Sequence, residues 1–410
     1  ERGKELMTEE VKFENWSKGV NNVSHGSRVP EGFARDMLNL YPAGGRISLR
    51  PGTTNVYAGS KVRGLFAVGE KLLCVDSAEL KDALTGEVLA TVPATGQVSG
   101  TVMNHQMYLS VGADRLIYTP YVGVAKWGVP LPVNGGSTYG VDPTRTAEQI
   151  RRGRAVRKFT FTQVDSEGVE SGARHGQTLG GTVNVPEPTP GYSVRLYATE
   201  PDGSVYYLQG EFSAAQAITS GPTNNAGAQL RTLFMDAPPP ADFLTNDNGC
   251  IVLASANFVY HTPPFQPHLV DLEGGFFMYP SPVTAMCGGK DGVYLSADKC
   301  YKLGGIGTDQ IRQETVLKYP AVPGTMHTTP EGVAAWATAY GLALETPTDR
   351  GGTVVSEPTK QAFVPGKSKD GASGTVEHNG ERLFVTNVRP DIDSSPLAAA
   401  GYFEAEVIRP

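Results

Sequence analysis

By residue type and spacing, two histidines are the best candidates in this sequence for metal ligands. His261 and His268 flank a segment that contains Pro263, Pro264 and Pro267. Each proline fixes φ and removes an amide donor, so we expect this segment to be extended. Imidazoles at the two ends of an extended segment lie too far apart to share a metal ion easily. The sequence therefore predicts a surface loop here and no metal site.

Catalytic signatures are missing from the sequence. It contains no nucleophile elbow, HExxH motif, P-loop or dinucleotide fingerprint. Aspartates and glutamates are scattered through predicted turns, and the Ser-x-Asp-x-Gly-x-x-Trp box of sialidases does not occur. A glycosidase can still assemble two carboxylates from separate sheets. We expect no enzyme and no cofactor, and the alternative is a carbohydrate-binding or glycan-hydrolysing β-propeller.

The cysteines indicate thiols rather than a metal centre. Cys74, Cys250, Cys287 and Cys300 follow no zinc-site spacing. We interpret them as buried, reduced thiols of a protein made in a cytoplasm. A disulfide between Cys287 and Cys300, across a hairpin, stays open as the alternative.

One dense basic run lies in an otherwise acidic chain. It consists of Arg151, Arg152, Arg154, Arg157 and Lys158, whereas the net charge of the 410 residues is -7. Non-specific nucleic-acid binders usually carry a positive excess. The run could contact DNA phosphate, but it favours an edge that faces an acidic neighbour. We therefore predict that the first three arginines are interface residues.

Turn-forming residues dominate the composition. The chain has 49 Gly and 30 Pro, which exceeds the average of about 12% for the two together. Such frequent turn residues indicate an all-β protein with many tight connections. No apolar run approaches the roughly 18 residues that span a bilayer. No signal peptide is visible at the charged start, although processing could have removed one, and we expect no membrane anchor.

A strand–turn–strand unit recurs along the chain. The copies are residues 64–75, 100–111, 250–260, 283–296, 333–344 and 374–386. About six units of roughly 35–45 residues have the size of propeller blades. The small residues Gly64, Gly100 and Ala254 would suit a crowded central axis. An array of β-sandwiches would look the same locally and is the competing interpretation.

One segment, from about residue 154 to residue 236, interrupts this repeat. Residues 156–165 alternate cleanly between apolar and polar, and Asp202-Gly203 separates two more alternating runs, which is a strong hairpin signal. Residues 128–144 and 237–240 are predicted linkers into and out of the segment. Trp127, at the start of the first linker, is predicted to anchor this junction.

The first 45 residues indicate an N-terminal arm. Residues 31–40 can form one short helix with apolar residues on a single face. Residues 46–57 indicate a strand that is interrupted near Pro51. Residues 403–409 alternate like a strand at the other end of the sequence. We predict that residues 46–57 and 403–409 pair in one blade, because this closes a propeller without leaving exposed edges.

Three motifs near the start carry a family resemblance. F-x-x-W-x-K-G-x-N-N begins at Phe13, V-P-x-G-x-x-R-D-x-x-N at Val29, and G-x-x-x-x-R-P-G-x-T at Gly45. This region resembles the N-terminal part of bacteriophage tail proteins built on a β-propeller, the hub or nozzle (tail accessory) proteins of short-tailed phages and their relatives. Residues 194–208 resemble the hairpin of a fibronectin type III module, an insert typical of that family.

The resemblance implies a structural virion protein, located in the phage tail and made in the host bacterial cytoplasm. It implies a homo-oligomeric ring, expected to be a hexamer, around a channel through which DNA passes without sequence-specific binding. Expected partners are portal adaptor or tail tube proteins and tail fibre, spike or needle proteins. Phe13 and Trp16 are the aromatic residues with which the arm would dock on a neighbour.

These observations predict an all-β fold, namely an about six-bladed β-propeller with an inserted fibronectin-III-like β-sandwich and an N-terminal arm. The predicted boundaries are residues 1–45 for the arm, 46–145 for the first part of the propeller, 146–236 for the insert, and 237–410 for the second part of the propeller.

Overall fold

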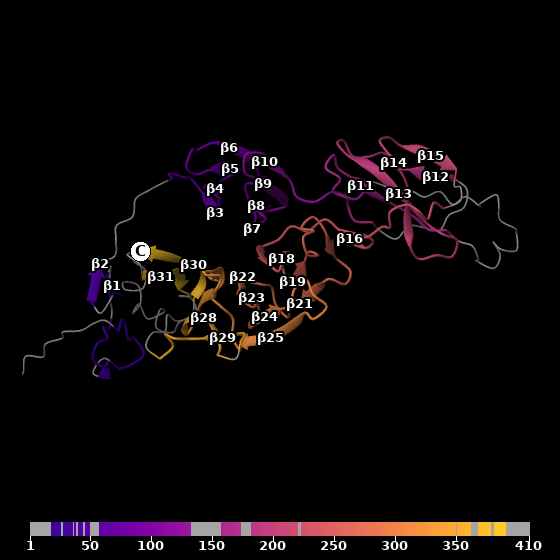
Figure 1. Cartoon of the computed structure of the whole chain (residues 1–410). Helices are drawn as coiled ribbons and strands as arrows, with labels where there is room; N and C mark the ends of the chain where they lie inside the picture. The colour runs from indigo at the N-terminus through magenta and orange to yellow at the C-terminus, as the bar shows by residue number, and fades with distance from the viewer. Residues whose placement is uncertain are drawn as a thin grey trace, which may run out of the picture. The chain divides into compact units, whose positions relative to one another are not determined.

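The computed structural model of the chain is built from β-strands. It describes residues 18–25, 28–35, 37, 40–43, 46–49, 57–132, 157–173, 182–219, 223–349, 351–361, 368–378 and 381–390. These residues form strands β1 to β31 and contain no α-helix, so the all-β prediction is confirmed (Figure 1). No helix in this part of the chain is long and apolar enough to cross a bilayer.

The chain divides into two compact units. The first comprises residues 1–58, 284–302 and 313–410, and the second comprises residues 59–283 and 303–312. Both units contain four-stranded antiparallel sheets in which strands that follow one another along the chain are paired. This up-and-down order needs only short connections, which the frequent glycines and prolines supply.

Three such sheets lie in the second unit. The first sheet contains β3 (Val62–Val68), β4 (Lys71–Asp76), β5 (Glu79–Asp82) and β6 (Val88–Thr91). The second contains β7 (Val98–Met103), β8 (Gln106–Val111), β9 (Asp114–Thr119) and β10 (Gly123–Lys126). The third contains β17 (Phe243–Asp247), β18 (Cys250–Ser255), β19 (Phe258–His261) and β21 (Phe276–Met278).

Two further four-stranded sheets and a long hairpin follow along the chain. One sheet contains β22 (Ala285–Gly289), β23 (Gly292–Ser296), β24 (Cys300–Gly304) and β25 (Arg312–Leu317). The other contains β26 (His327–Thr328), β27 (Ala334–Thr338), β28 (Gly341–Pro347) and β29 (Thr353–Ser356). The hairpin is β30 (Ser368–His378) with β31 (Glu381–Pro390).

Each of the six repeat copies predicted from the sequence forms an antiparallel hairpin. The hairpins are β3–β4, β7–β8, β18–β19, β22–β23, β27–β28 and β30–β31. The sequence therefore places these local pairings correctly. The number of blades and the closure of a ring stay predictions.

The first strands of successive sheets pack against one another. In the second unit β3 contacts β7 and β7 contacts β17, and in the first unit β22 contacts β26 and β26 contacts β30. A Cβ atom on Gly64 would lie 2.8 Å from the Phe66 ring, and one on Gly100 would lie 2.8 Å from the Leu109 side chain. These distances are shorter than normal Cβ contacts, so a larger residue at either position would force the neighbouring side chains to shift.

Residues 157–236 contain two small sheets around a common apolar core. β11 (Phe159–Val164), β13 (Ser193–Thr199) and β14 (Tyr206–Phe212) form one sheet, and β12 (Thr182–Val185) pairs with β15 (Gln216–Thr219). Phe161, Val183 and Leu196 belong to one buried cluster that draws on both sheets. The predicted Asp202-Gly203 turn joins β13 to β14, with Asp202 at a φ of 59°. The fibronectin-like identity of this segment, and its status as a separate domain, stay predictions.

The two ends of this segment lie close together. At its C-terminal end, β16 (Met235–Asp236) pairs with β20 (Val270–Asp271), which lies in the connection between β19 and β21 of the third sheet. A Cβ atom on Gly128 would lie 2.9 Å from the Cβ of Ala237, so the predicted incoming and outgoing linkers run past one another. An inserted segment requires this proximity.

The predicted helix over residues 31–40 is wrong. Pro30 and Gly32 shape a turn instead, in which the Phe33 amide donates to the Pro30 carbonyl at 3.3 Å and Gly32 has a φ of 88°. A positive φ cannot continue a right-handed helix. The chain then forms the hairpin of β1 (Leu40–Ala43) and β2 (Arg46–Leu49). The predicted partner of this region, residues 403–409, lies outside the described residues, so that pairing stays a prediction.

Trp127 joins the second and third sheets. Its side chain is 1% exposed, and its indole Nε1 donates to the Pro267 carbonyl at 2.7 Å. The Tyr108 ring meets it edge-on at 5.4 Å between centroids. Ile251 and Leu253 belong to the same buried cluster. Trp127 thus fastens the end of β10 to the third sheet, next to the linkers.

His327 joins the last hairpin to β26. Its Nδ1 lies 2.9 Å from the Ser373 hydroxyl and its Nε2 lies 2.8 Å from the Thr375 hydroxyl. The Phe384 ring lies 5.4 Å from the imidazole, between centroids. Burial lowers the pKa of His327, because a charged imidazole would lose hydration.

We expect Trp127→Ala to lower the free energy of unfolding by about 3–5 kcal/mol, because it leaves a cavity and removes a hydrogen bond. Trp127→Phe should cost about 1–2 kcal/mol, because it keeps most of the packing and loses the bond to Pro267. Urea unfolding followed by circular dichroism measures both. A loss below about 1 kcal/mol for the alanine variant would contradict this role.

We expect acid to loosen the β30–β31 hairpin. A lowered pKa in the folded state means that the unfolded chain binds the proton first, so stability is full above the unfolded histidine pKa of about 6.5 and falls as the pH drops below it. Protection factors of β30 amides, which correct exchange rates for the intrinsic effect of pH, should fall between pH 7 and pH 5 in the wild type. His327→Gln should flatten this pH dependence. If the variant keeps the pH dependence of the wild type, His327 is not the group responsible.

Candidate functional site

The interface residues predicted from the sequence lie outside the described part of the chain. This applies to Phe13, Trp16, Arg151, Arg152 and Arg154. Their predicted roles therefore stay predictions. The site described below comes from residues that sequence reasoning did not select.

The loop between His261 and His268 turns where an extended segment was expected. The Gln266 amide donates to the Pro263 carbonyl at 3.1 Å, and the Leu269 amide donates to the Gln266 carbonyl at 3.2 Å. Prolines in the loop suit turns as well as extended chain, which is why the sequence expectation of an extended segment is wrong. Within the described residues, no group of three or more His, Cys, Asp or Glu side chains is placed to hold a metal ion.

The four cysteines are buried free thiols. Burial raises the pKa of the Cys250 thiol to about 11 and that of the Cys300 thiol to about 12, because a thiolate would lose its hydration. The pKa of Cys287 is raised further in the same direction by burial. Thiols held in the neutral form are poor nucleophiles, so these three fill the core rather than react.

A pocket of about 490 Å³ opens at one end of the first two sheets of the second unit. In an up-and-down sheet alternate hairpins project from the same end, so the β3–β4, β5–β6, β7–β8 and β9–β10 turns gather there. All four turns contribute to the wall, from Val68 to Lys71, Asp82 to Thr85, His105, and Tyr118 to Tyr121. The volume falls in the range of about 300–1,000 Å³ that is usual for small-molecule sites.

An ion pair forms one side of the pocket. Lys71 Nζ lies 2.5 Å from the Asp82 carboxylate, which is 1% exposed, whereas the lysine side chain is 38% exposed. The Leu84 amide also donates to Asp82 at 3.0 Å. The hydrogen bond from Lys71 lowers the pKa of Asp82, outweighing the opposing effect of burial, and the same bond raises the pKa of Lys71. The pair is therefore charged at neutral pH.

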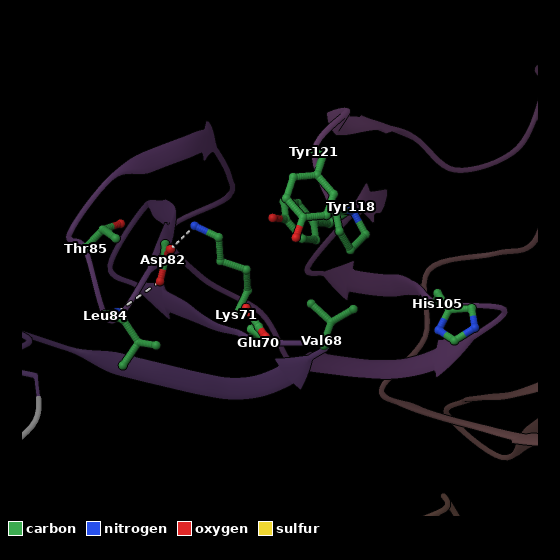
Figure 2. A pocket seen from close by; sticks show the side chains of 11 residues that line it. Val68, Glu70, Lys71, Asp82, Leu84, Thr85, His105, Tyr118 and Tyr121 are labelled. Carbon is green, nitrogen blue, oxygen red and sulfur yellow. Dashed lines mark hydrogen bonds and ion pairs between the residues drawn. The ribbon is translucent and has the colours of Figure 1, made fainter.

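Two tyrosines form the opposite side, as Figure 2 shows. Tyr118 is 4% exposed and belongs to the core between the two sheets, whereas Tyr121 is fully exposed. Tyr121 is the third residue of a turn that begins at Thr119 and is closed by a 3.1 Å bond from the Val122 amide to the Thr119 carbonyl. Its φ of 67° is typical of the third position of a type II turn, which usually holds glycine.

His105 lines the pocket from the β7–β8 turn. Asn104 and His105 both have positive φ, at 51° and 62°. A two-residue turn with two positive φ values is the type I′ hairpin turn, whose second residue is most often glycine. Side chains other than glycine in this conformation cost on the order of 1–3 kcal/mol. The pocket thus holds two bulky side chains at positions where glycine would be less strained.

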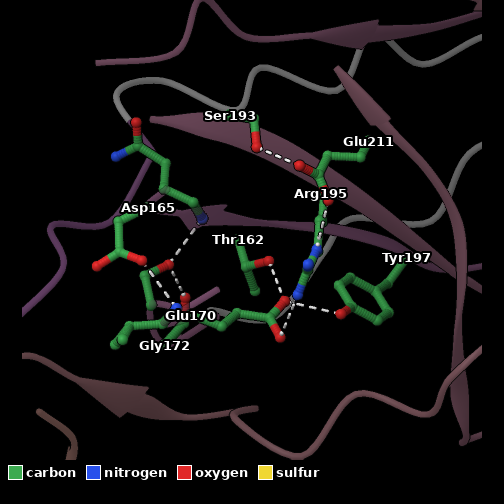
Figure 3. A network of polar contacts seen from close by, with 11 residues as sticks. Thr162, Asp165, Glu170, Gly172, Ser193, Arg195, Tyr197 and Glu211 are labelled. Atoms are coloured by element: carbon green, nitrogen blue, oxygen red, sulfur yellow. Dashed lines mark hydrogen bonds and ion pairs between the residues drawn. The ribbon is translucent and has the colours of Figure 1, made fainter. Parts of the chain in front are cut away.

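A second polar cluster lies in the segment of residues 157–236, and Figure 3 shows Glu170 at its centre. Glu170 accepts hydrogen bonds from the Thr162 and Tyr197 hydroxyls, the latter at 2.7 Å, and its carboxylate lies 3.4 Å from Arg195. Arg195 Nε also binds Glu211 at 2.9 Å. Burial and the bond to Glu170 raise the pKa of Tyr197. Because these groups satisfy one another, the cluster fastens the loop after β11 to the sheet.

The first unit contains a comparable buried carboxylate. Glu345 is 2% exposed and accepts from the Lys290 amide at 2.9 Å, the Ala334 amide at 3.0 Å and the Tyr294 hydroxyl at 3.2 Å. Two of its donors are backbone amides of neighbouring sheets, so Glu345 links β22–β23 to β27. This cluster is also a structural link, whereas the pocket at the turns of the first two sheets has the size and the exposed groups to receive a ligand.

Comparisons with known proteins identify no family. No family model matches the sequence, and no curated protein matches it. Solved structures align over much of the chain at low identity. One is the extracellular domain of a one-component system from B. thetaiotaomicron, with 8% identity, a TM-score of 0.26, and coverage of 70% of this chain and 33% of that chain.

Two other alignments span longer fractions of the known structures. Streptogramin B lyase aligns with 10% identity and a TM-score of 0.31, over 81% of this chain and 94% of that chain. BBS1N, solved in complex with ARL6DN, aligns with 12% identity and a TM-score of 0.29, over 81% of this chain and 91% of that chain. TM-scores this low carry no inference about the present chain.

We expect Asp82→Asn to make the second unit less stable at neutral pH and less sensitive to acid. Because the folded-state pKa of Asp82 is lowered, its contribution is present above the unfolded pKa of about 3.9 and is lost as the pH falls through the folded value. Thermal unfolding between pH 7 and pH 2 measures this. Asp114→Asn, which removes an exposed charge from the second sheet, controls for the change in net charge. Parallel pH profiles for wild type and Asp82→Asn would contradict the role of the pair.

Proposed function

We propose that this chain is a structural protein of a bacteriophage tail, serving as a hub, nozzle or connector. The observation that carries the proposal is the set of three N-terminal motifs that resemble those of tail hub and nozzle proteins. The all-β fold and the recurring four-stranded sheets are compatible with a propeller of that kind. In the proposal, the sheets form about six blades, and residues 146–236 form a fibronectin-like insert.

Two of the motifs form one structural element. The Lys18 amide donates to the Gly32 carbonyl at 3.0 Å, the Ala34 amide to the Gly19 carbonyl at 2.8 Å, and the Asn21 amide to the Ala34 carbonyl at 2.7 Å. These bonds form a parallel bridge between Val20 and Ala34. We call residues 18–25 with 28–35 the clasp.

Several motif residues have structural roles in the clasp. Ala34 is 3% exposed and Asn21 is 4% exposed. The Asn21 side chain accepts the Ser24 amide at 2.9 Å, and Arg35 donates to the Ser24 carbonyl at 2.8 Å. Gly19 and Gly32 both have a φ of 88°, which favours glycine. The motif residues therefore shape the backbone, as expected for an assembly element.

The proposed assembly is a homo-oligomeric ring around the DNA ejection channel. Six copies are proposed because the tails of the resembling family are six-fold. The acidic net charge of -7 suits a channel wall along which DNA passes without binding. The adaptor or tail tube would bind one face, and fibres, spikes or a needle would bind the outer surface. In a ring, one face of each protomer must complement a different face of the next.

Particle analysis tests the proposal. We expect the chain in purified particles of the encoding phage, as a ring on the tail axis in images of the tail. Deletion of residues 1–40 should leave a folded protein that does not join particles, because docking of the arm supplies the burial that orders it. Absence of the wild-type chain from purified particles would refute the proposed function.

The docking residues have a sharper test. The double variant Phe13→Ala with Trp16→Ala keeps the clasp and should fold with an unchanged Tm, yet its incorporation into particles should fall at least about tenfold, since aromatic anchors dominate such interfaces. Leu49→Ala, which truncates a 77% exposed side chain of β2 just after the arm, is the control. Normal incorporation of the double variant would refute the docking role alone.

A further inference from the structure

The strain in the pocket is concentrated at its opening. His105 and Tyr121 line the pocket and both have positive φ, at 62° and 67°. They come from different turns of different sheets, so one local sequence effect does not account for both. Backbone strain of this kind clusters at binding sites, where the surrounding fold holds a side chain in position.

The Tyr121 side chain gains nothing from packing within this chain. Its relative exposure is 101%, and the next residue, Val122, is 84% exposed. Pro120 fixes the preceding φ and so holds the turn that presents the ring. The turn therefore fixes where the backbone presents the ring, and an exposed aromatic ring at the edge of a pocket can serve as a binding platform.

The polar groups of the pocket favour a neutral ligand with many hydroxyls. Lys71 and Asp82 neutralise each other at 2.5 Å, and Glu70 adds a second carboxylate to the wall, so no lining lysine or arginine is left unpaired to attract an anion. Lys71 offers a donor and the neighbouring, exposed Glu70 offers an acceptor, which suits two adjacent hydroxyls. Thr85 and His105 add groups that can both donate and accept.

We propose that this pocket binds neutral carbohydrate. The apolar face of a pyranose ring stacks on Tyr121, because the face of an aromatic ring is negative and attracts polarised C–H hydrogens. Hydroxyls of the same sugar exchange hydrogen bonds with Lys71 and Glu70 on the opposite side of the pocket (Figure 2). The proposal concerns binding only and does not depend on the tail function, since the site lies within the second unit.

Saturation-transfer NMR on the full chain provides the test. The probes are maltotriose, cellotriose and triacetylchitotriose as neutral sugars, with 3′-sialyllactose and inorganic phosphate as anionic probes. At about 10 mM, a concentration that detects weak ligands of this size, at least one neutral trisaccharide should bind. The anionic probes should not bind more strongly than that neutral trisaccharide, and they should not displace it. Failure of all three neutral sugars, or preference for an anionic probe, overturns the proposal.

Four variants test whether the sugar binds on the Tyr121 ring. Tyr121→Ala and Tyr121→Gly should weaken binding at least tenfold, on the scale of losing one aromatic contact. Tyr121→Phe should retain it, because the ring face remains. Phe265→Ala is the matched control, since Phe265 is also exposed at positive φ but lies outside the pocket. Equal binding by wild type and Tyr121→Ala overturns the proposal.

A stability measurement separates strain from loss of the ring. Tyr121→Gly and Tyr121→Ala both remove the ring, but only glycine relieves the positive φ. The glycine variant should therefore unfold about 2 °C above the alanine variant, while both lose binding. A glycine variant that is no more stable than the alanine variant contradicts the argument that the fold holds Tyr121 under strain for binding.

Discussion

The close packing of first strands is the constraint on which the rest of the described structure depends. β3 lies against β7 and β7 against β17, and a Cβ atom on Gly64 or Gly100 would press on the Phe66 and Leu109 side chains packed between these strands. This spacing sets the sheets side by side, so that their hairpins project together. The pocket exists because four turns from two sheets meet at one end, and no single turn could form it.

Three buried or half-buried acids among the described residues link separate segments. Asp82 binds Lys71 and an amide, Glu170 binds two hydroxyls and Arg195, and Glu345 binds one amide of the β22–β23 turn and one of β27. A carboxylate can accept several hydrogen bonds, so it satisfies donors at turns where strand pairing ends. Acids that look scattered in the sequence are therefore part of the connections between sheets.

Local patterns predicted the strands but not the site. The six hairpins and the Asp202-Gly203 turn follow from signals a few residues long, which sequence carries well. The helix predicted over residues 31–40 failed because apolar spacing gave no warning of the positive φ at Gly32. Tyr121 was missed for a related reason. Its turn type is usually recognised by glycine, and Asp82 and Lys71 across the pocket lie 39 and 50 residues earlier in the chain.

The gathering of turns at one end has a consequence for how such a protein can diversify. The Gly69, Leu84, His105 and Tyr121 turns are short, separate along the chain, and outside the strand pairings that hold the sheets. Loop tips accept substitutions and insertions more readily than sheet interiors do. Recognition and folding are therefore encoded by different residues, so the surface can be reshaped in small independent steps while the framework stays intact.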